Sequence, residues 1–138
     1  MKKKIISLVF ITASVCIFNM ISGFKPFDEK KPWPVPDNYK NMKNPVASNA
    51  ESIADGKTLY STHCKSCHGA KGLGDGSKAA TLKTEPGDFS SADFHAQTDG
   101  AIFYKTSEGR DDMPSFKKKI ADKDDIWSIV NYVRTLKK

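Results

Sequence analysis

Residues 64–69 read Cys-Lys-Ser-Cys-His-Gly and form the most specific motif in this chain of 138 residues. Two thiols stand one helical turn apart, and an imidazole follows the second thiol directly. A structural zinc site would need further ligands, and His63 and His95 do not lie at a familiar zinc spacing. A thioredoxin-type redox pair follows a β-strand, and no β-branched run precedes Cys64. A disulfide between Cys64 and Cys67 remains as an alternative, but it would leave the adjacent histidine unexplained.

The spacing Cys-x-x-Cys-His is that of covalent haem attachment. Cys64 and Cys67 would form thioethers with the two vinyl groups along one edge of a porphyrin. His68 would then direct its imidazole at the iron from the proximal side. We therefore predict one covalently bound haem c, with its iron, per chain. Covalent attachment also suits a domain of this size, whose core is marginal without a cofactor.

A second iron ligand is expected downstream, and Met113 is the best candidate. It lies 45 residues after His68 in the polar loop at 111–116. Pro114 favours an extended conformation at Met113, which suits a loop that presents a thioether inward. The alternative role of this methionine is to fill the core. Three other side chains offer a nitrogen or sulfur ligand but fit less well: His95, His63 and Met42.

The flanking residues predict helices. Residues 49–63 form a helical pattern that begins at Asn49, a plausible N-cap. Gly56 and Tyr60 share one face of this helix, and a glycine there indicates close approach of a second helix. The partner is the C-terminal helix, which follows the N-cap Asp122. Its apolar residues repeat at helical spacing: Ile126, Ile129, Val130, Val133 and Leu136.

A further helix is predicted at residues 98–108, capped by Thr98 or Asp99, with Ile102 and Phe103 facing the cofactor. The chain between the Cys-x-x-Cys-His motif and this helix is rich in glycine and predicts turns. Together these patterns predict an all-α domain at residues 49–138 whose first and last helices cross and whose loops wrap one haem.

The N-terminal 48 residues have a different character. Residues 1–23 contain no acid; Met1 is followed by three lysines and then by an apolar run, which indicates a signal peptide or an N-terminal membrane anchor. The apolar run at 5–22 would be about 27 Å long as a helix, close to the ~30 Å hydrocarbon core, so cleavage and anchoring both remain open. Residues 24–48 hold five of the seven prolines and predict an extended linker. Trp33 and Tyr39 indicate that part of this segment packs on the domain.

The charge balance argues against nucleic acid as a partner. Three of the 22 Lys and Arg residues precede the N-terminal apolar run, which leaves 19 against 16 acidic residues. No basic stripe for phosphates remains, and the length fits one domain. A local run of lysines does stand at Lys117, Lys118 and Lys119, just after the Met113 loop. This run is either a solvated surface or a docking patch for an acidic partner.

The chain resembles the class I c-type cytochromes, the family with one haem and His/Met ligation, over residues 49–138. The resemblance rests on five segments: 56–60, 64–69, 72–76, 113–116 and 126–136. It implies that Cys64 and Cys67 are the thioether anchors, His68 the proximal ligand and Met113 the distal ligand.

The same resemblance implies that Gly56 and Tyr60 meet the C-terminal helix near Tyr132. In the family a proline carbonyl usually accepts a hydrogen bond from the proximal imidazole. Pro86 is the nearest candidate, although it lies later than in the compact mitochondrial pattern.

These observations predict a one-electron carrier of the bacterial cell envelope rather than an enzyme. An iron with His and Met ligands has no open position for oxygen or peroxide, and the thioether raises its reduction potential. The expected partners are redox proteins, including membrane respiratory complexes, and the protein is expected to be an exported monomer, either soluble in the periplasm or tethered. Two alternatives remain: a haem c subunit of a larger oxidoreductase complex, or a five-coordinate haem enzyme or ligand-binding protein.

Overall fold

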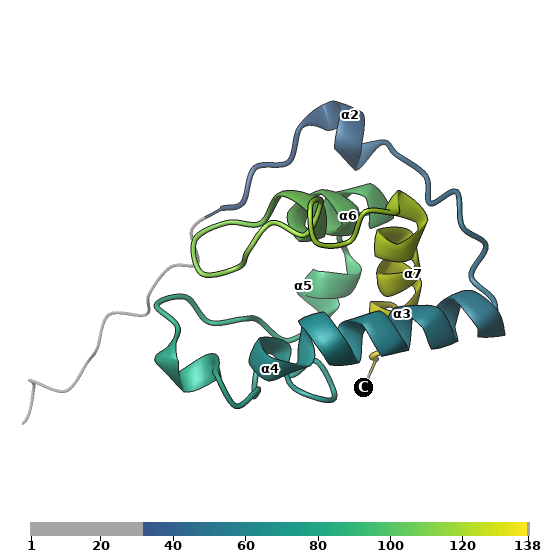
Figure 1. Ribbon diagram of the computed structural model, residues 1–138. Coiled ribbons are helices and arrows are strands. Elements are labelled where there is room, and N and C mark those ends of the chain that lie inside the picture. The colour runs from purple at the N-terminus through teal and green to yellow at the C-terminus, as the bar shows by residue number, and fades with distance from the viewer. Residues whose placement is uncertain (1–31, 138) are drawn as a thin grey trace, which may run out of the picture. The chain divides into compact units, whose positions relative to one another are not determined.

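A computed structural model describes residues 32–137, and the structural statements below concern these residues (Figure 1). The predicted signal peptide or membrane anchor at 1–23 and the first part of the predicted linker lie outside the described residues. In the described range, none of the helices has the length and apolar character needed to cross a membrane.

The regular structure between residues 32 and 137 is helical. The elements are α2 (Asp37–Lys40), α3 (Ala50–His63), α4 (Lys65–His68), the 3-10 helix η1 (Ala79–Thr81), α5 (Ala92–His95), α6 (Asp99–Glu108) and α7 (Lys123–Val133). Strand-type pairing in this range is limited to one isolated bridge between Arg110 and Met113. The predicted all-α class is confirmed.

The predicted helix starts agree with the side-chain caps. The Asn49 side chain accepts from the Ser52 N–H at 2.9 Å, and the Ser52 hydroxyl accepts from the Asn49 N–H at 3.2 Å. Thr98 caps α6 and Asp122 caps α7 through the same kind of bond to a backbone N–H. These caps satisfy N–H groups that the first turn of a helix leaves without an intrahelical acceptor.

The C-terminal helix is shorter than predicted. It ends at Val133 rather than Leu136, because the chain tightens there into hydrogen bonds between residues three apart. The Thr135 hydroxyl also donates to the Tyr132 carbonyl at 2.7 Å. Leu136 nevertheless packs against the core, so the apolar repeat correctly indicated burial beyond the end of the helix.

Helices α3 and α7 pack directly on each other through Gly56. A Cβ atom at Gly56 would collide with the backbone of Ser128 in α7, so a side chain is excluded here. One turn further along α3, the ring of Tyr60 lies 5.1 Å from that of Tyr132. Figure 1 shows α3 crossing α7. This contact positions the end of α3, where the Cys-x-x-Cys-His motif begins.

Helix α6 completes the core against α7. Phe103 stacks on Trp127 with ring centroids 4.1 Å apart, and both side chains are buried. The prediction that Phe103 faces the cofactor is therefore wrong. Neighbouring residues of a helix point about 100° apart around its axis. When Ile102 faces the cavity, Phe103 therefore points toward α7.

Part of the predicted linker packs on the helices. The ring of Tyr39 in α2 lies 4.8 Å from that of Tyr104 in α6. Further along, Asn44 donates to the Asn131 side chain at 2.8 Å, and Asn131 donates to the Val46 carbonyl at 3.2 Å. Residues 37–46 therefore contribute contacts of their own to α6 and α7.

Candidate functional site

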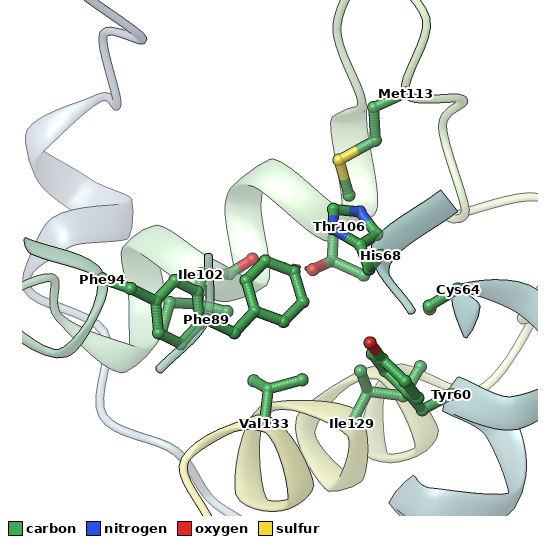
Figure 2. A pocket seen from close by; sticks show the side chains of 10 residues that line it. All are labelled: Tyr60, Cys64, His68, Phe89, Phe94, Ile102, Thr106, Met113, Ile129 and Val133. Carbon is green, nitrogen blue, oxygen red and sulfur yellow. Dashed lines mark hydrogen bonds between the residues drawn. The ribbon is translucent and has the colours of Figure 1, made fainter. Parts of the chain in front are cut away.

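A cavity of about 310 Å³, part of it open to solvent, lies between α3, α4, α6 and α7 (Figure 2). Four chemically distinctive side chains contribute to its wall: Cys64, His68, Thr106 and Met113. The remaining lining residues are aromatic or aliphatic: Tyr60, Phe89, Phe94, Ile102, Ile129 and Val133. Such a space, apolar with a few converging polar groups, is typical of a cofactor site.

The predicted attachment residues lie where α3 passes into α4. Cys64 follows the last residue of α3 and is buried, whereas Cys67 in α4 is partly exposed. Both are free thiols, so the alternative of a disulfide between them is not realised here. Burial, followed by the nearby Cys67, raises the pKa of the Cys64 thiol to about 12. Only Cys64 contributes to the cavity wall.

His68 has the properties of a metal ligand. Its ring is buried, and its Nδ1 is the one buried side-chain nitrogen or oxygen of the described residues that lacks a hydrogen-bonding partner. Burial lowers the pKa of this imidazole to about 4, while the Pro86 backbone acts in the opposite direction. The ring is therefore neutral near pH 7, which is the form that binds a metal. Pro86 is also the proline that the family resemblance indicated.

Two contacts hold His68 in place. The Tyr60 hydroxyl donates to the Gly69 carbonyl at 2.7 Å, which fixes the chain directly after His68. The His68 ring stacks on Phe89 with centroids 4.5 Å apart, and Phe89 stacks on Phe94 at 4.6 Å. The imidazole therefore has one wall of aromatic rings that restricts its rotation.

Met113 reaches the same cavity from the loop between α6 and α7. Arg110 and Met113 exchange backbone hydrogen bonds of 2.8 and 2.9 Å, which closes a tight turn. Asp111 in that turn has a φ of 52°, in the left-handed region that costs energy for a residue with a side chain. Figure 2 shows the Met113 side chain directed from this loop toward the His68 ring.

Gly109 allows the backbone of the Met113 loop to pass close to the end of α6. Its φ of 69° suits glycine, and a Cβ atom there would lie 2.5 Å from the Met113 carbonyl oxygen. These backbone contacts define the local shape of the loop around Met113.

The other candidate ligands lie elsewhere. The His95 ring points its Nε2 to within 3.5 Å of the Leu136 carbonyl, and the His63 ring packs 5.9 Å from that of Phe116. Met42 is exposed on the segment that packs on α6. None of the three contributes to the cavity wall. No group of three or more His, Cys, Asp or Glu side chains in the described range could hold a metal ion without a cofactor.

Sequence reasoning missed Phe89, Phe94 and Thr106 as lining residues. Thr106 follows Ile102 by one helical turn, so the two share the cavity face of α6. Phe89 and Phe94 stand in the glycine-rich region, where no periodicity marked them. The one available signal was Ser91, a residue type that favours the N-cap position, which caps the short helix α5 (Ala92–His95) that contains Phe94.

The cytochrome c family model matches residues 53–137, which is more than half of the chain. This chain belongs to the cytochrome c family. Its residues fit the haem c of the family, since a buried imidazole with an unpartnered nitrogen and a thioether line one cavity beside the Cys-x-x-Cys-His motif. The cytochrome therefore carries covalently bound haem c with iron.

Several solved structures are similar to the cytochrome, among them the following two. One is a chain of the reducing HAO-like protein complex of Kuenenia stuttgartiensis, with a TM-score of 0.63 and 27% identity over 81% of this chain. The cytochrome spans about half of that chain, 54% of its length. The other is the KustC0563 c-type cytochrome, with a TM-score of 0.54, 32% identity, and coverage of 61% of this chain and 99% of that one. Among curated proteins, no sequence matches.

Proposed function

We propose that the cytochrome is a one-electron carrier of the bacterial cell envelope, with His68 and Met113 as the axial ligands of its iron. The observation that carries this proposal is that these two side chains, 45 residues apart, line the same cavity. When bound, haem c supplies an iron centre that gains and loses one electron. Cys64 and Cys67 would hold the porphyrin through thioethers, so the small domain would not depend on burial to retain it.

The chain's own residues favour electron transfer over chemistry on a small ligand. If His68 and the Met113 thioether both bind the iron, it would have no open position for oxygen or peroxide. The apolar rings and aliphatic side chains of the cavity limit the access of water. A site with two protein ligands and a mostly apolar wall would change little when an electron arrives, which favours electron transfer.

The lysines at 117–119 supply a candidate docking patch. All three are exposed, and Phe116 beside them is buried in the core. Lys117 pairs with Glu108 at 2.6 Å, and Lys119 lies 5.5 Å from the centroid of the Phe116 ring. The patch would attract an acidic redox protein through association that weakens as salt is raised.

Export and tethering are part of the proposal. The lysines and apolar run at residues 1–23 would direct the chain across the cytoplasmic membrane, where it is either released as a soluble periplasmic monomer or stays anchored. Cell fractionation of the full chain, followed by the mass of its N-terminus, tests both points. Recovery in the cytoplasm would contradict export.

A second candidate role is that of a subunit in a larger redox complex. It is supported by the similarity to a chain of the reducing HAO-like protein complex, of which the cytochrome spans 54%. Size-exclusion chromatography of material purified from its native host separates the two roles. A free carrier elutes as a monomer, whereas a subunit elutes with other proteins.

Reaction with carbon monoxide tests the carrier proposal. The reduced full-length holoprotein is mixed with carbon monoxide and its absorption is followed. A six-coordinate carrier should bind carbon monoxide slowly or not at all, and Met113→Ala should bind it rapidly. Rapid binding by the unaltered protein would contradict the proposal and favour a five-coordinate enzyme or ligand-binding protein.

A further inference from the structure

Asp112, the residue before Met113, connects two loops that are far apart in the sequence. Its Oδ2 accepts hydrogen bonds from the backbone N–H groups of Lys83 at 2.7 Å and Thr84 at 3.1 Å. Two successive N–H groups that converge on one oxygen form a small anion site, and bonds to a charged acceptor are stronger than neutral ones. Figure 1 shows the loop after α6 and the chain between α4 and α5 on the same side of the helices.

Residues 83–84, which donate to Asp112, are followed in the chain by residues close to His68, the other predicted ligand. Pro86, whose backbone acts on the His68 imidazole, follows Thr84 by two residues. Asp112 and Met113 are adjacent residues of the chain. The two hydrogen bonds therefore join the loop that carries the proposed distal ligand to the segment that continues to Phe89, whose ring stacks on the proposed proximal ligand.

Two backbone features that shape the Met113 loop are local. The Arg110–Met113 turn and the close approach of Gly109 lie within a few residues of the methionine. They fix the shape of the loop, but they do not tie it to the segment at 83–84. The Asp112 bonds do so, because they span 28 and 29 positions of the chain.

We propose that Asp112 is a positioning residue that holds the Met113 loop closed and thereby protects the Met113–iron bond from competing ligands. This inference rests on the proposed His68/Met113 ligation. Without the two bonds, the loop on which Met113 stands gains conformational freedom, and conformations with the thioether withdrawn become more populated. A competing ligand then binds more tightly in proportion to the population of the open form.

Imidazole is the probe, titrated into the oxidised full-length holoprotein and followed by absorption. Asp112→Ala should lower the apparent Kd for imidazole about tenfold or more. Asp112→Asn keeps a neutral acceptor, so its Kd should lie between those of Asp112→Ala and the unaltered protein. Asp55→Ala, which removes an exposed carboxylate on α3, should leave the Kd unchanged.

A second pair of variants tests the donor side of the same hydrogen bonds, at Lys83. Lys83→Pro removes the N–H donor, and Leu82 before it has a φ of −83° and a ψ of 148°, which is compatible with a following proline. Lys83→Ala removes the same charge but keeps the N–H. Lys83→Pro should lower the Kd for imidazole as Asp112→Ala does, and Lys83→Ala should not. This pair tests the inference even if Asp112→Ala does not fold.

Two results would overturn the inference in distinguishable ways. If Asp112→Ala and Lys83→Pro keep the sulfur-to-iron charge-transfer band of the oxidised protein and bind imidazole as the unaltered protein does, the positioning role is refuted and the ligation stands. If the unaltered protein has no such band and already binds imidazole freely, the proposed ligation fails and the positioning role fails with it.

Discussion

The hydroxyl of Tyr60 donates a hydrogen bond to the carbonyl oxygen of Gly69 at 2.7 Å, and both residues are buried. This bond ties the core helix α3 to the chain directly after His68. Its position means that the helix pair α3–α7 does more than stabilise the domain. It also fixes the place where the haem-attachment motif ends.

Tyr60→Phe should lower the free energy of unfolding by about 1–2 kcal/mol, because the buried Gly69 carbonyl loses its donor. Denaturant unfolding of the holoprotein measures the loss. Tyr132→Phe is the control, because phenylalanine retains the packing of the Tyr132 ring on Tyr60. Equal effects of the two variants would contradict a specific role of the Tyr60 hydroxyl.

Gly56→Ala should destabilise the domain by about 2–3 kcal/mol or more, because the new methyl group would meet the Ser128 backbone. A backbone cannot move aside as a flexible side chain can, so α3 and α7 must separate. Thermal unfolding of the holoprotein measures the change. Lys57→Ala, on the exposed side of the same helix, should be nearly neutral, and a neutral Gly56→Ala would show that the two helices are not in close contact.

Asn131→Ala should loosen the segment that precedes α3. The buried Asn131 amide donates to the Val46 carbonyl and the Ser52 hydroxyl, and it accepts from Asn44. Its loss leaves buried groups without partners, at a cost of about 2–3 kcal/mol. Limited proteolysis should then cut within residues 40–48 faster. Asn41→Ala, at an exposed position outside this network, should be cut at the original rate. Unchanged cleavage in Asn131→Ala would contradict the role of this network.

Changing Lys117, Lys118 and Lys119 together to Glu should slow oxidation of the reduced protein by ferricyanide about tenfold at low ionic strength. The anionic oxidant is attracted by the native patch and repelled by the altered one, and added salt should shrink the difference. Glu substitutions at Lys43, Lys57 and Lys123 change the net charge equally on other exposed positions. Identical rates and salt dependence in the two triple variants would refute a local docking patch.

Much of this fold could be predicted because short-range chemistry determines it. The Asn49 cap, the glycine of α3 and the apolar repeat of α7 each leave a local pattern in the sequence, and the structure contains all three. The Cys-x-x-Cys-His motif is likewise a local signal, and membership of the cytochrome c family agrees with it.

The features that escaped prediction depend on long-range packing. Phe103 turns to Trp127 and away from the cavity, and nothing within residues 98–108 reveals where α7 will lie. Phe89 and Phe94 line the cavity from a stretch without regular periodicity. The hydrogen bonds between Asp112 and residues 83–84 join positions almost thirty residues apart, so no local sequence pattern could predict them.

The absorption spectrum of the oxidised holoprotein tests the central proposal, His68/Met113 ligation, most directly. The unaltered protein should have the weak sulfur-to-iron charge-transfer band of a methionine-ligated haem. Met113→Ala should lose this band, and Met42→Ala, at an exposed methionine outside the cavity, should keep it. A band that persists in Met113→Ala, or that is absent from the unaltered protein, would contradict the account.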